Sequence, residues 1–268
     1  MERPGWVGED VDLNTPSPAR IYDYLLGGSH NLAVDRAVAE QVLVAMPDAR
    51  SGALANRSFL YRAVRFLVDA GVRQFLDLGS GIPTAGNVHE IAQRAAPGAR
   101  VVYVDSDAVA VAHSRALLTG NEGAGVVESD IRDVDRIMAS PEAARLLDPA
   151  EPVGLLMVAI LHVIPDADDP AGLVAGLRDR VAPGSYLVVG HGTADSRPED
   201  AARLEEVSKR TPTPLTLRPR AEVERFFDGF DMVEPGLIWA PLWRPDPGDE
   251  PGQHPELAAN YGGVGIRR

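Results

Sequence analysis

The alternation that begins at Gly71 constrains this chain most: short aliphatic and β-branched runs take turns with longer amphipathic segments. Such alternation is typical of a parallel sheet whose strands are joined by right-handed helical crossovers. We expect strands at residues 73–78, 100–105, 125–129, 153–160 and 185–190, and two more near 230–234 and 236–243. Helices are expected at about 84–96, 107–119, 133–147, 169–182, 198–210 and 221–228. The pattern predicts an α/β fold.

The residues before Gly71 lack this alternation. Residues 1–16 are rich in Pro, Gly and Asp without an apolar period, which indicates an irregular arm. Ser17 and Pro18 suit the cap and first turn of a helix that the Gly27-Gly28 pair ends. Two more helices are expected from about 31 to 46 and from 54 to 70. We therefore expect a helical cap at residues 17–70 and the sheet domain at residues 71–268.

Composition excludes several kinds of site and partner. The 268 residues include no cysteine, which excludes disulfides, thiolate zinc sites, iron–sulfur clusters and cysteine nucleophiles. Acidic residues outnumber basic ones 39 to 26, so a nucleic acid or an anionic membrane is not the expected partner. The longest apolar run, residues 153–164, is too short to span a bilayer, and the first residues do not resemble an export signal. We expect a cytoplasmic protein that does not bind membranes.

A glycine turn follows the first expected strand, in the segment DLGSGIPTAG at residues 77–86. Open α/β sheets bind nucleotides where such a strand passes into a helix. Gly79 and Gly81 let the backbone turn sharply and approach a ligand closely. The spacing is not GxGxxG, because Thr84 stands where the third glycine would be. This departure argues against a dinucleotide, so a nicotinamide oxidoreductase is a minor alternative.

Acidic residues close the first three expected strands. The Asp77 carboxylate would repel a pyrophosphate but attract a ligand that carries an ammonium and a sulfonium, and S-adenosylmethionine is such a ligand. Asp105 follows Gly81 at the spacing typical of an acid that binds ribose hydroxyls. Asp130 could meet the adenine amine. The alternative is that such acids only cap helices, as Asp105 and Asp107 could both do.

Several longer motifs carry a resemblance to a known family: PSPARIYDYLLGGSHN, DLGSGIPTAGNVHE, VVYVDSDAVAVAHSRALL, RTPTPLTLRPRAEVERFFDGF and YGGVGIRR. The chain resembles, from about Pro16 to Arg268, a family of S-adenosylmethionine-dependent methyltransferases of GC-rich, actinobacterial-type bacteria that was long labelled a domain of unknown function. The resemblance implies a Rossmann-like class I methyltransferase sheet of seven strands, the last antiparallel, with an added N-terminal helical cap. It places the cofactor site at Asp77, Gly79, Ser80, Gly81, Asp105, Ser106, Asp130 and Ile131.

Fewer residues are candidates to act on the methyl acceptor than to bind the cofactor. Methyl transfer from a sulfonium needs orientation more than acid–base help, but a base would assist a hydroxyl or amine acceptor. His162 and His191 follow the fourth and fifth strands, and Tyr22 lies on the first cap helix. Each has a structural alternative: local hydrogen bonds for the histidines and packing for the tyrosine. Arg20 could clamp the methionine carboxylate, or it could form a surface ion pair with Asp23 or the N-terminal arm.

The substrate itself is not specified by any motif. Loops after strands are the expected contacts, namely Thr211–Pro214 and the glycine-rich stretch Tyr261–Gly265. Asp166, Asp168 and Asp169 lack metal-loop spacing, so no metal site is expected. Two functions remain open: methyl transfer to a small-molecule acceptor, and a catalytically silent module that binds S-adenosylmethionine or S-adenosylhomocysteine. The sequence leaves the oligomeric state open.

Overall fold

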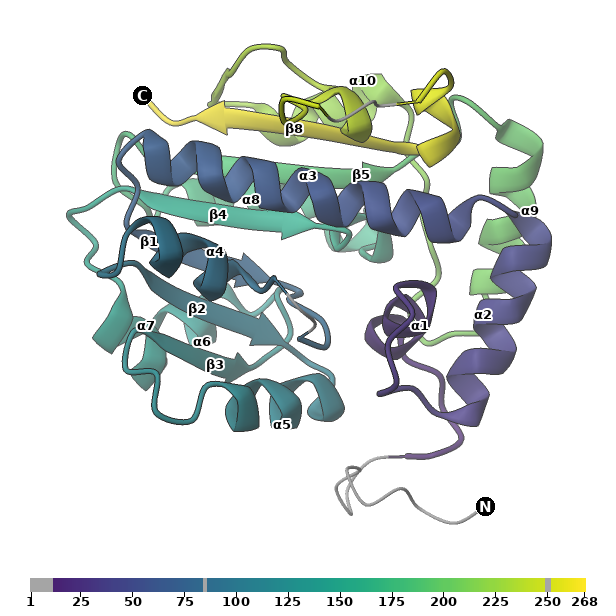
Figure 1. Ribbon diagram of the computed structural model, residues 1–268, viewed down its shortest axis with the longest axis horizontal. Helices are drawn as coiled ribbons and strands as arrows, with labels where there is room; N and C mark the ends of the chain where they lie inside the picture. The colour runs from purple at the N-terminus through teal and green to yellow at the C-terminus, as the bar shows by residue number, and fades with distance from the viewer. Residues whose placement is uncertain (1–11, 84–85, 249–251) are drawn as a thin grey trace.

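One mixed sheet organises the chain in the computed structural model, which describes residues 12–83, 86–248 and 252–268 (Figure 1). The strand order is β3-β2-β1-β4-β5-β8-β6. The parallel strands are β1 Gln74–Leu78, β2 Arg100–Asp105, β3 Ala124–Glu128, β4 Val153–Val158 and β5 Tyr186–Gly192. β8 (Asn260–Ile266) is antiparallel to β5, and β6 (Asp231–Met232) and β7 (Ile238–Trp239) pair antiparallel with β8. The expected mainly parallel α/β sheet with an antiparallel C-terminal strand is confirmed.

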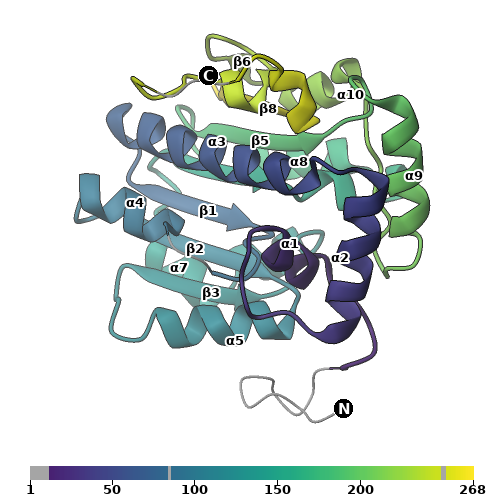
Figure 2. The same ribbon diagram turned by 45° about the vertical axis from the view of Figure 1, so that its right-hand side comes forward.

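Helices cover both faces of the sheet (Figure 2). One face packs against α3 (Ala49–Asp69), α4 (Val88–Ala95) and α5 (Ala108–Leu117). The other packs against α6 (Val134–Met138), α7 (Pro141–Leu146), α8 (Pro170–Arg178) and α10 (Arg220–Glu224). Alternate residues of one strand enter different cores, as Phe75 and Leu76 of β1 do. Because both faces are covered, nearly every residue of the inner strands is buried, and this explains why short apolar runs predicted them.

The remaining helices α1 (Pro18–Leu25), α2 (Ala33–Ala45) and α9 (Pro198–Ser208) lie beyond the carboxyl ends of the parallel strands, on the side to which their arrowheads point (Figure 1). Ile21, Val42 and Leu204, one from each helix, share a separate apolar cluster. The cap thus recruits α9 from the far half of the sequence, whereas α3 mainly covers the sheet. The domain boundaries proposed from the sequence, 17–70 and 71–268, stay a prediction, and residues 1–11 of the expected arm lie outside the described residues.

The carboxylate of Asp35 joins the first two cap helices. It is fully buried and accepts hydrogen bonds from the Ser17 amide at 2.9 Å, the Leu32 amide at 2.7 Å and Arg20 Nε at 2.9 Å. The first two bonds satisfy amides at the starts of α1 and α2, where no helical carbonyl is available. A buried carboxylate needs such partners to offset its lost hydration. Asp35 therefore fixes how α1 crosses α2.

Residues Tyr261–Gly265 are not a loop, as the sequence suggested, but the middle of β8. The prediction was wrong because three glycines interrupt the run of bulky apolar side chains that identifies a buried strand. A Cβ at Gly262 would lie 2.9 Å from the buried Phe59 ring on one face, and a Cβ at Gly263 would lie 3.0 Å from Leu237 on the other. The expected strand at 236–243 is also shorter, because η4 (Ala240–Leu242) follows β7 directly.

Short 3-10 turns complete the fold: η1 (Leu161–Val163), η2 (Asp166–Asp168), η3 (Arg225–Phe227) and η5 (Pro255–Ala258). Among the described residues, none of the helices combines the length and the apolar character needed to cross a bilayer.

Replacing Gly262 by alanine tests the close packing of β8 on α3. We expect Gly262→Ala to lower the free energy of unfolding by about 1–3 kcal/mol, the usual cost of overpacking a rigid core. Gly98→Ala is the matched control, since a Cβ there meets no atom within 4 Å. Urea unfolding of the two variants measures the difference, and equal stabilities would contradict the packing described.

Candidate functional site

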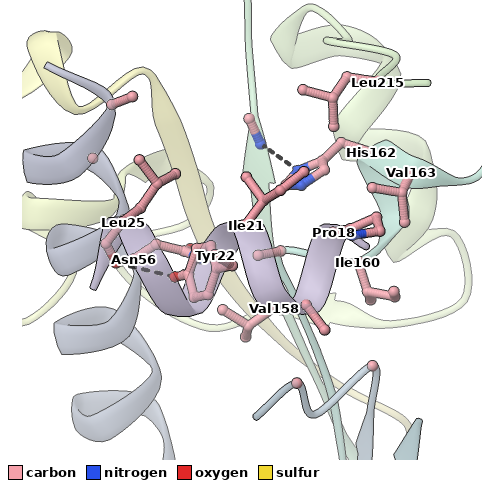
Figure 3. A pocket seen from close by; sticks show the side chains of 18 of the residues that line it. Pro18, Ile21, Tyr22, Leu25, Asn56, Val158, Ile160, His162, Val163 and Leu215 are labelled. Atoms are coloured by element: carbon pink, nitrogen blue, oxygen red, sulfur yellow. Dashed lines mark hydrogen bonds between the residues drawn. The ribbon is translucent and has the colours of Figure 1, made fainter. Parts of the chain in front are cut away.

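A cavity of about 310 Å³ lies between the cap and the carboxyl ends of the strands (Figure 3). The turns after β1, β2 and β4 form its floor, and α1, α2, α9 and the start of α3 form its walls. Its size is within the range of small-molecule sites. Of the cofactor and catalytic residues proposed from the sequence, those that line it are Tyr22, Asp77, Gly79, Ser80, Gly81, Asp105, Ser106 and His162.

The glycine turn after β1 has the conformation that its sequence predicted. Gly79 and Gly81 have φ values of +72° and +67°, which other residues rarely adopt. A Cβ at Gly79 would lie 2.5 Å from the Ile160 side chain, whereas a Cβ at Gly81 would meet no atom within 4 Å. The Gly79 and Ser80 amides both donate to the Val104 carbonyl of β2. Thr84, the departure from the dinucleotide motif, lies outside the described residues.

Asp105 ends β2 and braces this turn. One carboxylate oxygen accepts from the Gly81 amide at 2.7 Å and the other from the Asp107 amide at 2.8 Å. Asp107 is the N-cap of α5 and accepts from the Val109 and Ala110 amides, as the capping alternative predicted. Burial raises the pKa of Asp105 to about 6, against the opposing effect of its backbone hydrogen bonds. Asp105 thus reaches the cavity already held in one orientation.

Asp77 contributes a second buried carboxylate to the cavity. Burial raises its pKa to about 7, the charge of Arg57 opposes that rise, and the charge of Asp105 adds to it. Arg57 extends from α3 and also lines the cavity. Two buried acids so close together favour a cationic ligand, because a positive charge between them would stabilise both ionised forms.

Asp130 and Ile131 follow β3 but do not line this cavity. Asp130 is held by Arg132, whose Nε donates to Oδ1 at 2.9 Å, and this contact lowers the pKa of Asp130. Ile131 is buried in the core under α6 and α7. Their proposed role toward an adenine ring stays a prediction.

Arg20 is also outside the cavity lining. Besides its bond to Asp35, its guanidinium donates to the Thr15 carbonyl at 2.6 Å and lies 3.5 Å from the Asp107 carboxylate. The arginine is buried, so the ion pair that the sequence allowed on the surface lies in the interior. In this structure Arg20 ties the cap to the start of α5.

Tyr22 faces the cavity with its hydroxyl already engaged. The hydroxyl donates to the Ala53 carbonyl at 3.0 Å and accepts from Asn56 Nδ2 at 3.3 Å (Figure 3). Burial raises the pKa of the phenol. Both facts keep the proton on Tyr22, so the ring supplies an apolar wall.

His162 lies in η1, just beyond β4. The backbone turns back there through Ala159, whose φ of +63° is rare for a residue with a Cβ. His162 Nδ1 accepts from the Gly192 amide at 3.2 Å (Figure 3). Burial, followed by the nearby Arg218 charge, lowers the pKa of His162 to about 4. The neutral ring therefore carries its proton on Nε2, the tautomer that donates rather than accepts at that atom.

His191 lies beneath the cavity and not in its lining. The ring is fully buried, with Nδ1 2.7 Å from the Gly192 carbonyl and Nε2 3.2 Å from Arg218 Nη1. The Nδ1–H group donates a hydrogen bond to the carbonyl, and the guanidinium donates one to Nε2, so both ring nitrogens have partners. His191 matches its structural alternative of a histidine satisfied by local hydrogen bonds.

The comparisons with known proteins agree with this geometry. The family model described as S-adenosyl methyltransferase matches residues 4–268. The chain belongs to this methyltransferase family. Among curated proteins none matches the sequence.

Two crystal structures resemble the chain over nearly its whole length. A DUF574 family protein from Streptomyces avermitilis is 39% identical with a TM-score of 0.92, over 96% of this chain and 99% of the other. A candidate methyltransferase from Thermobifida fusca is 37% identical with a TM-score of 0.92, over 99% and 100%. Human N-acetylserotonin methyltransferase in complex with SAM is 15% identical with a TM-score of 0.50, over 95% and 63%, and shows a likeness of fold alone.

Sequence reasoning missed several polar residues of this cavity, among them Asn56 and Arg57 on α3. The sequence did contain a pattern that could have identified Arg57. Residues 57, 60, 64 and 67 have the spacing of one helix face, and Leu60, Val64 and Leu67 on that face are apolar and buried. A cation on the apolar face of a helix marks a site candidate. The loop at Thr211–Pro214 was expected to approach the substrate, and Thr211 and Thr213 do line the cavity. Across the described part of the chain, no cluster of acids and histidines could hold a metal ion.

The tautomer of His162 can be tested by nitrogen NMR of the histidine rings. We expect a neutral ring with its proton on Nε2 down to about pH 4, assigned by comparison with His162→Gln. Because the folded pKa is lowered, the unfolded state binds more protons between pH 4 and 6.5. The contribution of the neutral ring to the free energy of unfolding is therefore complete above about pH 6.5 and decreases as the pH falls toward 4. Titration near pH 6.5 would contradict this environment.

Proposed function

We propose that this protein transfers a methyl group from S-adenosylmethionine to a small-molecule acceptor. The observation that carries the proposal is the pair of buried carboxylates, Asp77 and Asp105, beside a glycine turn that leaves room for a ligand. A phosphate would be repelled there, whereas an ammonium and ribose hydroxyls complement the two acids. Family membership supports the same cofactor.

The donor groups of the cavity fit this cofactor. Asp77 would pair with the ammonium of the methionine moiety. Asp105 would accept hydrogen bonds from the ribose hydroxyls through the lone pairs that the Gly81 and Asp107 amides do not use. Ser80 Oγ is buried without a hydrogen-bond partner, which suits a polar ligand atom. Arg57 supplies positive charge for the methionine carboxylate. S-adenosylmethionine, when bound, supplies a methyl carbon already activated for displacement.

The residues of the chain then contribute orientation and exclusion of water. The cap closes the cavity over the strand ends with apolar side chains such as Ile21 and Val42. Alignment of the acceptor with the methyl carbon lowers the entropic part of the barrier. The acidic surface balance, a net charge of −13, supports a small acceptor rather than a nucleic acid, and we also propose a cytoplasmic location.

Calorimetric titration with S-adenosylmethionine, S-adenosylhomocysteine and NADH tests the proposal. We expect micromolar binding of the first two and none of NADH. Absence of binding by the first two would overturn it. Release of S-adenosylhomocysteine in the presence of an acceptor separates methyl transfer from the alternative, a catalytically silent binding module.

The proposal also predicts how binding depends on pH. Asp77 has a pKa of about 7 and must be ionised to hold the ammonium, so protons compete with the ligand below pH 7. We expect the Kd of S-adenosylhomocysteine to rise about twentyfold from pH 8 to pH 6, about tenfold from protonation of Asp77 and about twofold more from protonation of Asp105, whose pKa is about 6. Calorimetry at several pH values measures it.

Asp77→Asn provides the control for this pH dependence. The variant should bind more weakly at pH 8 but show only about a twofold change in Kd down to pH 6, which Asp105 with its pKa of about 6 would cause. Arg57 on α3 and the phenol of Tyr103 on β2 also lie near Asp77, and burial raises the pKa of that phenol, which keeps it neutral in this window. A slope that persists in Asp77→Asn would assign the effect to another group.

A further inference from the structure

The cavity has two chemically different halves. Its charged lining residues, Arg57, Asp77, Asp105 and Asp107, come from α3 and the ends of β1 and β2. The half beneath the cap is lined by apolar residues of α1, α2, α9 and the loop after α9: Ile21, Leu25, Val38, Val42, Leu204, Leu215 and Leu217. The proposed cofactor accounts for the charged half only. The apolar half is therefore the space for the acceptor.

The polar groups of the apolar half are uncharged. Tyr22 keeps its proton in a bond to a backbone carbonyl, and Thr213 Oγ1 and Asn56 Oδ1 are buried without hydrogen-bond partners. None of the described residues that line this half carries a charge at neutral pH, because His162 is neutral. A cationic acceptor would find no carboxylate here and would be repelled by the sulfonium. A carboxylate acceptor would find no arginine fork or lysine for its two oxygens, whereas an acceptor with a single anionic oxygen needs only one donor.

His162 donates a hydrogen bond in this half and does not act as a base. Its Nδ1 faces the Gly192 amide, and a base role for Nε2 would require a proton on Nδ1, where that amide already donates. Protonation of the ring is further opposed by burial and by Arg218, while His191 on β5 is neutral. The acceptor must therefore lose its proton without help from this histidine.

On the basis of the proposed function, we infer that the acceptor is an aromatic compound with an acidic hydroxyl, a phenol or enol, which binds as its anion. The apolar half buries the rings, and the His162 Nε2–H donates to the oxyanion. The positive sulfonium offsets the cost of burying that negative charge. Neutral alcohols are excluded as substrates because they would need a base.

The transfer step balances without a further reagent. The hydroxyl proton leaves to water before binding. A lone pair of the oxyanion then forms the O–CH3 bond while the C–S bond breaks, and its electron pair stays on sulfur. The negative and positive charges cancel, which gives a methyl ether and S-adenosylhomocysteine.

Matched acceptors test the inference. We would measure binding to protein saturated with S-adenosylhomocysteine, and turnover with S-adenosylmethionine, for 2-hydroxy-1,4-naphthoquinone and other acidic phenols of one to three rings. The weakly acidic 1-naphthol and the cationic 1-naphthylmethylamine are the comparisons. We expect the acidic compounds to bind and be methylated, and the amine not to bind. The rate with 1-naphthol should rise about tenfold per pH unit as it ionises.

Other outcomes overturn the inference in identifiable ways. If S-adenosylhomocysteine binds but no acidic phenol binds to the loaded protein, the acceptor class is wrong while the proposed function stands. If S-adenosylhomocysteine itself does not bind, the proposed function fails first. Preference for the amine, or a rate with 1-naphthol that ignores its ionisation, would indicate a base that this structure does not assign.

Substitutions at His162 separate a donor from a base. His162→Gln keeps an N–H group and should retain most of kcat, whereas His162→Leu removes the donor and should lower kcat about tenfold or more with an acidic phenol. The Kd of S-adenosylhomocysteine should stay unchanged in both. Equal loss of kcat in the two variants, with loss of the acidic limb of the pH profile, would support a base and overturn the inference.

Two neighbouring positions on α2 test where the acceptor lies. Val42 is buried in the cavity wall, whereas Val44 is 82% exposed. We expect Val42→Phe to weaken acceptor binding to the loaded protein about tenfold without changing the Kd of S-adenosylhomocysteine, and Val44→Phe to change neither. Leu204→Phe on α9 is the second variant if Val42→Phe does not fold. Weakened binding of S-adenosylhomocysteine instead would place the cofactor in the apolar half.

Discussion

The carboxylate of Asp105 joins the two strand-end turns on which the site depends. It accepts one amide from the glycine turn after β1 and another from the start of α5. Without it, the Gly81 and Asp107 amides would face a buried space with no acceptor, which carries a cost of about 1–3 kcal/mol for each group. The same side chain is thus a structural brace and a ligand group, so the geometry of the site is set before any ligand arrives.

The cavity is electrostatically asymmetric because its buried carboxyl groups lie on one side only. Asp77 and Asp105 are dehydrated by the strand ends and the cap, which raises both pKa values. The opposite wall has no ionised group among the described residues, and its histidine is held neutral. A site with this division provides binding energy for a cation at one end and an apolar surface at the other. Methyl transfer requires that the cofactor and the acceptor be held in a fixed orientation relative to each other, and a site divided in this way would hold one on each side.

The sequence predicted the parallel strands and the glycine turn because both depend on local patterns. Short apolar runs marked β1 to β4, whose residues are mostly buried because helices cover both faces of the sheet, and the turn needed glycines at 79 and 81. Features decided by distant contacts were not predictable. α9 joins the cap only through tertiary packing, and β8 lacks a run of bulky apolar residues because its glycines make room for Phe59 and Leu237. Arg20 found a partner in Asp35, which no spacing rule identifies.

The position of β8 has a consequence for how the chain reaches this state. β8 lies between β5 and β6, so the interior of the sheet is closed by residues 260–266. Until those residues leave the ribosome, β5 presents an open edge that can pair with another chain. Sequence-distant pairing of this kind also slows folding. A nascent chain of this fold would therefore depend on protection of that edge during synthesis, and chaperone occupancy should end when β8 inserts.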